Sequence, residues 1–355
     1  MNIDNEISLL CRLIATTSFS REETATADLI VDYLSAAGVT AHRLGNNVWA
    51  FAGEYDPGRP TLLLNSHHDT VRPAAGYTRD PFNPEISGDR IYGLGSNDAG
   101  ASVVSLIRTF LEFRDRELPF NLLLALSAEE ETGGENGMRA LLPHLEAEGI
   151  RIDCTIVGEP TDMQPAIAER GLVVLDCETP GVAGHAARGE GVNAIYRAID
   201  DITALRDFRF PVVSQVLGPV GLNITVIEAG RQHNSIPDLC KWVVDVRTTD
   251  AQSNEEVVEA LRSAVKWSRL TPRSTRVRAS VISESHPLVK SITALGLKPF
   301  VSPTTSDMAF MHTFPSVKIG PGMSARSHSA DEFVGISEIS RAVDIYCKIL
   351  NNLIL

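Results

Sequence analysis

Histidine, aspartate and glutamate residues gather in five short segments of the sequence, and these residue types bind metal ions and transfer protons. The segments are His67-His68-Asp69, Asn97-Asp98, Glu129-Glu130-Glu131, Gly158-Glu159-Pro160 and Ser327-His328. Singly, each has an ordinary explanation, because a histidine or aspartate after a strand often caps a turn and three glutamates often form a solvated face. Together they favour a metal site, since carboxylates at one sheet edge repel one another unless cations neutralise them. A mixed imidazole and carboxylate set suits zinc, cobalt or manganese better than calcium or magnesium.

Short apolar runs precede several of these segments and predict the strands that position them. Residues 61–64, 121–127 and 154–157 are too short for helices and too uniformly apolar for half-exposed strands. We interpret them as buried strands of a largely parallel sheet, which would place the polar residues that follow at one edge. Upstream, Ser20 and Glu23 have the spacing of a capping box and predict an amphipathic helix that ends before Gly38.

A different pattern begins near residue 168 and predicts an inserted domain. Its expected elements follow the order βαββαβ, which is typical of a split βαβ sandwich. They lie at residues 172–178, 192–205, 221–228, 240–247, 253–267 and 275–281. The chain then resumes helix, strand and loop patterns and ends in an amphipathic helix around residues 336–350. We therefore predict an α/β protein with a catalytic metal-binding domain at 1–167 and 284–355, interrupted by an α+β domain at 168–283.

The composition limits the class of protein. Of 355 residues, 32 are basic and 45 acidic, giving a formal net charge of −13, and the basic residues are dispersed, which argues against a nucleic-acid or anionic-membrane surface. No apolar stretch reaches the roughly 18–20 residues that span a bilayer, and the N-terminus lacks the basic flank of a signal peptide. We expect a cytoplasmic protein. The five cysteines are scattered without a CxxC pair, which favours reduced thiols over disulfides or a cysteine zinc site.

The motifs HHDT, SNDAG, AEEETGG, GEPT, GHAA, and GPG followed by SH occur in this order over nearly the whole chain. This order resembles the dizinc amidohydrolase family of acetylornithine deacetylase, succinyl-diaminopimelate desuccinylase, aminoacylase and carboxypeptidase G, and is most similar to the acetylornithine deacetylase branch. The resemblance implies a zinc-peptidase-like catalytic domain with a mixed, largely parallel sheet, and an inserted dimerisation domain. It also implies two Zn²⁺ ions as cofactors, with Co²⁺ or Mn²⁺ as alternatives.

The resemblance assigns a role to each metal segment. His67 and Glu159 resemble the terminal ligands of one zinc ion, Asp98 resembles the carboxylate that bridges both ions, and Glu131 and His328 resemble the ligands of the second.

Two further acidic residues match the family's proton-transfer machinery. Asp69 corresponds to the acid that orients a metal-binding histidine. Glu130 corresponds to the general base that takes a proton from the attacking water and passes it to the leaving amine. His68 is interpreted as a bystander.

Other matches concern the substrate and the second subunit. His185 resembles a histidine that reaches the partner subunit's active site and stabilises the developing oxyanion, although the family's proline after this motif is missing. Asn234 and Arg247 resemble the amide and guanidinium that bind the substrate carboxylate. Gly320 and Gly322 resemble the backbone lining of the substrate pocket.

These observations lead to one expected function and two alternatives. We expect a homodimeric hydrolase that cleaves a small-molecule N-acyl amino acid, of the N-acetyl- or N-succinyl-ornithine or citrulline type, in arginine biosynthesis. A dipeptidase or aminopeptidase of the same family is one alternative. A catalytically inactive metal-containing binding protein is the other, and the presence of Glu130 argues against it.

Overall fold

The computed structural model describes residues 3–355, and the chain divides into two compact units. The first contains the chain up to Ile167 together with Ile282–Ser302 and Ser306–Leu355, and the second contains Ala168–Val281 and Pro303–Thr305. Within residues 3–355, no helix is both long enough and apolar enough to cross a membrane.

Most strands of the first unit belong to a nine-stranded mixed sheet with the order β1-β2-β6-β3-β7-β17-β8-β15, in which β16 pairs with β8. The three predicted apolar strands form its middle: β3 (Thr61–His67) pairs in parallel with both β6 (Asn121–Ser127) and β7 (Cys154–Val157). All their residues are buried, as expected for parallel strands covered on both faces. The other strands are β1 (His42–Leu44), β2 (Asn47–Phe51), β8 (Ala166–Glu169), β15 (Ser280–Val281), β16 (Phe300–Ser302) and β17 (Ser316–Lys318).

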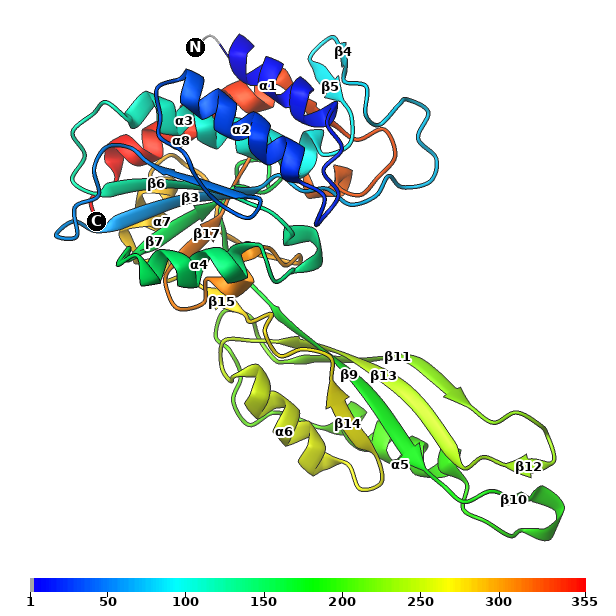
Figure 1. Cartoon of the computed structure of the whole chain (residues 1–355). Coiled ribbons are helices and arrows are strands. Elements are labelled where there is room, and N and C mark those ends of the chain that lie inside the picture. The colour runs from blue at the N-terminus through cyan, green and yellow to red at the C-terminus, as the bar shows by residue number, and fades with distance from the viewer. Residues whose placement is uncertain (1–2) are drawn as a thin grey trace. The chain divides into compact units, whose positions relative to one another are not determined.

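Helices cover both faces of this sheet. Side chains alternate along each strand, so both faces carry apolar residues that must be buried. Leu62 and Leu64 pack into one hydrophobic core, and Leu63 packs into another on the opposite face. Figure 1 shows α1, α2, α3 and α8 on one side of the strands and α4 on the other. The helices of this unit are α1 (Asp4–Ile14), α2 (Thr24–Ala36), α3 (Ala101–Phe113), α4 (Met138–Ala147), α7 (Pro287–Thr293) and α8 (Ile336–Asn352). A small antiparallel sheet contains β4 (Glu85–Ser87), β5 (Arg90–Tyr92) and β18 (Phe333–Gly335).

The second unit is a four-stranded antiparallel sheet in the order β11-β13-β9-β14, with two helices packed on its buried face. Its α6 begins with the predicted capping box of Ser253 and Glu256, which is confirmed. The elements are β9 (Gly171–Pro180), α5 (Ala194–Asp207), β11 (Gly221–Ala229), β13 (Leu239–Thr248), α6 (Asn254–Ala264) and β14 (Arg269–Pro272). Two short strands, β10 (Gly184–His185) and β12 (Ser235–Ile236), form a separate antiparallel pair.

The capping box predicted at Ser20 and Glu23 is wrong, although the helix that follows is present. α2 begins at Thr24 with no side-chain cap. The Ser20 hydroxyl instead donates to Asp69 Oδ2 at 2.7 Å, and Glu23 Oε1 accepts from the backbone N–H of Glu129 at 3.2 Å. Both side chains therefore connect the start of α2 to the polar segments that follow β3 and β6.

The end of the inserted βαββαβ pattern also differs from the prediction. α6 ends at Ala264, and the last strand of the four-stranded sheet is β14. The chain turns between them because the buried Asp201 carboxylate accepts hydrogen bonds from the backbone N–H groups of residues 266, 267 and 268, at 2.8, 3.0 and 2.7 Å. Of the strand predicted at 275–281, only β15 is present, and it pairs with β8.

Candidate active site

Three neighbouring parallel strands end at one edge of the sheet, and predicted site residues follow these ends. His67 is the last residue of β3 and lies opposite Ser127, the last residue of β6. Glu130 and Glu131 lie in a 3-10 turn shortly after β6, and Glu159 follows β7. The strand order thus brings together residues from distant parts of the sequence.

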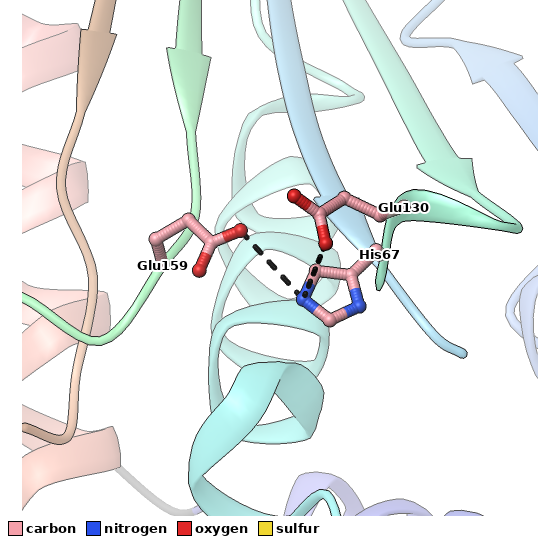
Figure 2. Close-up of side chains that lie close together, drawn as sticks. All are labelled: His67, Glu130 and Glu159. Carbon is pink, nitrogen blue, oxygen red and sulfur yellow. Dashed lines mark ion pairs between the residues drawn. The ribbon is translucent and has the colours of Figure 1, made fainter. Parts of the chain in front are cut away.

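His67 is the centre of the first half of the site. Its imidazole is 2% exposed, and Nε2 lies 3.2 Å from Asp98 Oδ1 and 3.6 Å from Glu159 Oε1. Glu130 Oε2 lies 4.0 Å from the same nitrogen, and Figure 2 shows both glutamates reaching toward this ring. Ligand-type atoms of His67, Glu130 and Glu159 lie within 4.8 Å of one another. One imidazole with several carboxylates is a donor set that fits a divalent ion.

Asp98 connects this half to a second one. It lies in the turn Ser96–Gly100, directly before α3, and the backbone at Asp98 itself is not helical. Its Oδ1 faces His67, whereas Oδ2 lies 3.8 Å from His328 Nε2. The same nitrogen of His328 lies 3.0 Å from the Glu131 carboxylate. The side chains expected to be the five ligands therefore lie in two sets that share Asp98.

Asp69 is fully buried and connects several parts of the site. Its Oδ1 lies 3.4 Å from His67 Nδ1 and accepts the backbone N–H of Glu130 at 3.0 Å. Its Oδ2 accepts the backbone N–H of Glu131 at 3.2 Å and the hydroxyl of Ser20. Asp69 thus holds the imidazole with Nε2 toward the carboxylates of Asp98 and Glu159. It also holds the turn that carries both glutamates, which the sequence alone did not indicate.

Buried negative charge is concentrated in this site. Burial and the charge of Asp98 raise the pKa of Glu159 to about 8. Burial and the charges of Glu159 and Asp307 raise the pKa of Glu130 well above its usual range, despite the opposing charge of His67. Burial would also raise the pKa of Asp98, but the hydrogen bond and charge of His67 outweigh it and lower that pKa. Carboxylates that face one another in this way are stabilised by cations, so charge as well as ligand type fits a pair of divalent ions.

Three predicted site residues lie in the second unit. His185 is exposed on β10, and its Nδ1 accepts the backbone N–H of Ala187 at 3.2 Å. Asn234 is exposed in the loop before β12. Arg247, at the end of β13, has a bidentate ion pair with Asp245 at 2.8 and 3.1 Å. Their contacts with substrate remain predictions.

The two predicted pocket glycines are buried and have a packing role. A Cβ on Gly320 would come within 2.6 Å of the Glu159 carbonyl oxygen, and a Cβ on Gly322 within 2.3 Å of Asn97 Oδ1. Gly322 also has a φ of +82°, which favours glycine. These glycines let their loop lie against the segments that carry Glu159 and Asp98, and a contact with substrate remains a prediction.

Two buried acids near the site have no role in the sequence-based prediction. Glu332 accepts hydrogen bonds from three backbone N–H groups, including that of Asp98 at 2.9 Å. Asp307 Oδ2 accepts the hydroxyl of Ser127 at 2.6 Å, at the end of β6. The only sequence signal for Glu332 was its proximity to His328.

His68, the expected bystander, lies against other residues of the first unit. Its Nδ1 lies 3.0 Å from Thr26 Oγ1, and its Nε2 lies 2.9 Å from the carbonyl oxygen of Asn46. Burial lowers its pKa to about 4. It therefore helps to hold α2 and the loop before β2 against the end of β3.

The pattern of peptidase family M20/M25/M40 matches residues 63–352, and the chain belongs to this family. It is therefore a hydrolase whose described residues could form a dimetal site. Succinyl-diaminopimelate desuccinylase of Paracoccus denitrificans is 29% identical over 380 residues, covering 98% of this chain and 98% of the relative. The protein of the same name from Zymomonas mobilis is 28% identical over 362 residues, covering 94% of each.

Solved structures with the same fold confirm the predicted α/β class. Aminopeptidase PepT of Bacillus cereus aligns with a TM-score of 0.79 at 16% identity, covering 99% of each chain. A dinuclear metal-binding peptidase of Bacillus subtilis aligns with a TM-score of 0.73 at 16% identity, covering 98% of this chain and 96% of the other. At these identities the likeness concerns the fold alone.

The relatives do not support the expected placement in the acetylornithine deacetylase branch. The proteins of Paracoccus and Zymomonas are named as desuccinylases of a different substrate. The expected role in arginine biosynthesis is likewise not supported. The motifs that suggested this branch surround the metal segments, so they indicate the chemistry that members of the family share more than the substrate that each one cleaves.

Proposed function

We propose that this protein hydrolyses the amide bond of N-acyl amino acids at a dimetal centre. The observation that carries the proposal is the position of Asp98, whose two oxygens face His67 and His328 separately, at 3.2 and 3.8 Å. Glu159 completes the first ligand set, and Glu131 completes the second. A carboxylate shared in this way suits two ions about 3.5–4 Å apart, the spacing of two-metal hydrolases.

Zinc suits the donor set, because imidazole nitrogen and carboxylate oxygen are its usual ligands, and Co²⁺ or Mn²⁺ can use the same ligands. Bound divalent ions supply Lewis acidity, which acidifies a water molecule and polarises the amide carbonyl. The charges also match, since the four carboxylates of the site balance two divalent cations. These are Asp98, Glu130, Glu131 and Glu159.

Glu130 is the proposed general base. Its carboxylate is 12% exposed and lies 4.0 Å from His67 Nε2, and Asp69 fixes its backbone N–H. As the carbon–oxygen bond forms, Glu130 accepts a proton from the attacking water. As the carbon–nitrogen bond breaks, it gives this proton to the leaving nitrogen, so that the products are a carboxylic acid and a free amino acid.

The proposed substrate is an N-acetyl- or N-succinyl-amino acid of the ornithine or citrulline type. The names of the relatives favour a succinyl group. The HHDT, AEEETGG and GEPT motifs surround the metal segments and do not distinguish an acetyl from a succinyl group. Both acyl groups need the same bond cleavage, so they share the machinery around Asp98 and Glu130. Asn234 and Arg247 are the proposed partners of the substrate carboxylate.

We propose that the second unit forms a homodimer. β11 is an edge strand of its sheet, and its Val226 and Ile227 are 45% and 52% exposed. On the adjacent α5, Tyr196 and Ile199 are 69% and 49% exposed. An edge strand beside exposed apolar side chains is a surface that a second copy can extend and cover. In such a dimer, His185 would act in the active site of the other chain and stabilise the oxyanion.

A substrate panel on zinc-loaded protein tests the function. It contains N-acetyl- and N-succinyl-ornithine, the corresponding citrulline compounds, N-succinyl-diaminopimelate and dipeptides with a free α-amino group, with Glu130→Gln protein as the control. We expect turnover of acylated amino acids that the control lacks. Faster cleavage of the dipeptides would favour the dipeptidase or aminopeptidase alternative. Two bound zinc ions without turnover of any compound would favour the binding protein.

A further inference from the structure

The turn that carries Asp98 and the loop that carries His328 hold each other through two side chains outside the proposed ligand set. One is Asn97, which precedes Asp98 and is fully buried. The other is Glu332, which follows His328 and is 2% exposed. Each side chain binds the segment opposite to its own, so the two contacts are reciprocal.

Glu332 holds the turn that carries Asp98. Its Oε2 accepts the backbone N–H of Gly95 at 3.0 Å. Its Oε1 accepts the backbone N–H groups of Asn97 and Asp98 at 2.8 and 2.9 Å. Three N–H groups directed at one buried carboxylate fix the backbone from which the shared ligand projects.

Asn97 holds the loop that carries His328. Its Oδ1 accepts the backbone N–H of Met323 at 2.9 Å, and its Nδ2 donates to the Met323 carbonyl at 3.1 Å and to Ser327 Oγ at 3.2 Å. Asn97 is therefore bound on both sides of the 3-10 turn that precedes His328.

His328 contacts the Glu131 carboxylate through Nε2, but its loop must hold its backbone in an unusual conformation. Its side chain is 53% exposed, in contrast to 2% for His67. Its φ is +55°, in the left-handed region that residues other than glycine rarely adopt. Gly322 provides the space for the support, because a Cβ there would come within 2.3 Å of Asn97 Oδ1.

We infer that Asn97 and Glu332 are positioning residues that set the separation of Asp98 and His328, so that Asn97 controls binding of the second ion and Glu332 controls binding of both. By second ion we mean the one proposed to be held by Asp98, Glu131 and His328, so the inference rests on the proposed function. Loss of a partner that orients a metal ligand typically weakens metal affinity by about 10–100-fold.

The two residues have different expected effects. Asn97→Ala removes all three contacts with the loop of His328 and leaves the three N–H bonds of Glu332 intact, so it should weaken the second ion alone. Glu332→Gln places an amide NH₂ group where a carboxylate oxygen accepts an N–H. It disturbs Asp98, which both ions share, and should therefore weaken both ions.

Zinc binding measures these effects without relying on catalysis. Zinc-loaded protein is dialysed against buffers of graded free Zn²⁺, and bound zinc is determined by elemental analysis. For Asn97→Ala, we expect the release of one ion to shift to about 10–100-fold higher free Zn²⁺, while release of the other stays as in the wild type. At saturating zinc its kcat should return to near the wild-type value. Asn193→Ala is the matched control: Asn193 Oδ1 accepts the N–H of Ile195 at 2.9 Å at the start of α5, and zinc release should be unchanged.

The outcomes separate this inference from the proposed function. Unchanged zinc release from Asn97→Ala, or an equal shift of both ions, would overturn it even in an active hydrolase. Wild-type protein that binds two zinc ions but hydrolyses no substrate would instead contradict the function. If Asn97→Ala does not fold, Ser327→Ala removes one of the same contacts, and a smaller selective shift of one ion is expected. Unchanged release from that variant would also overturn the inference.

Discussion

Replacing Asp98 with asparagine tests whether one carboxylate holds both ions. The substitution keeps the shape of the side chain, and the backbone N–H of residue 98 can still donate to Glu332. It removes one negative charge and converts one oxygen into an NH₂ group that cannot bind a metal. In the structure the two oxygens face His67 at 3.2 Å and His328 at 3.8 Å, so either orientation of the amide deprives one ligand set of its oxygen.

The loss of charge should affect both ions. Two divalent ions about 4 Å apart repel each other by roughly 16 kcal/mol at an effective dielectric constant of 20, four times the value for unit charges. The carboxylates of Asp98, Glu130, Glu131 and Glu159 balance these charges, and Asp98→Asn leaves one positive charge unbalanced. Removing one partner of a buried charge pair costs about 3–5 kcal/mol. That cost corresponds to a loss of about 10²–10⁴-fold in affinity for each ion.

Zinc release under graded free Zn²⁺ measures this loss. We expect Asp98→Asn to hold less than one ion per chain under conditions in which the wild type holds two. Asp201→Asn is the matched control, because the Asp201 carboxylate is also largely shielded from solvent but binds backbone N–H groups in the second unit. It should lose stability and keep both ions. If Asp98→Asn releases one ion and binds the other with wild-type affinity, Asp98 is not the shared ligand.

Three further predictions concern the base, the metal and the dimer. Glu130→Gln should lower kcat by about 10²–10⁴-fold with zinc content and melting temperature retained, because the amide cannot accept the proton; normal turnover would require another base. Removing zinc with a chelator should lower the free energy of unfolding by about 4 kcal/mol relative to protein at a zinc concentration 1,000 times Kd. An unchanged thermal melting curve would contradict the argument that bound cations stabilise the buried carboxylates. Mixing His185→Ala with Glu130→Gln protein should restore activity after subunit exchange, since one site of the mixed dimer then has both residues intact. If activity does not recover although exchange is proven, His185 acts in its own chain's site or outside the mechanism.

The central strands can be predicted from the sequence because burial on both faces leaves a strong signal. β3, β6 and β7 are buried throughout and each contains an apolar run, and a buried run of this length has few other stable structures. Once the strands are parallel and adjacent, the polar residues at their ends must meet. The positions of His67, Glu130 and Glu159 therefore follow from topology without any knowledge of side-chain contacts.

Side chains whose partners lie far away in the chain cannot be predicted in this way. Ser20 and Glu23 have the spacing of a local cap. Instead, Ser20 donates to the buried carboxylate of Asp69, and Glu23 accepts the buried backbone N–H of Glu129. The same limitation hides the contacts of Asn97. Its partners lie more than 200 positions away, separated by 226 and 230 residues in the sequence, and no local pattern marks them.

Asp69 and Glu332 show why the site contains more buried acids than the proposed ions require. Each carboxylate accepts backbone N–H groups from a turn that carries a ligand: Asp69 from the turn of Glu130 and Glu131, and Glu332 from the turn of Asp98. A buried carboxylate without such donors is unfavourable, and a turn without the carboxylate leaves its N–H groups unsatisfied. Each acid and its turn therefore stabilise one another. Because Asp98 is shared between the ligand sets, a change at Glu332 should reach both ions, whereas a change at Asn97 should reach only the ion beside His328.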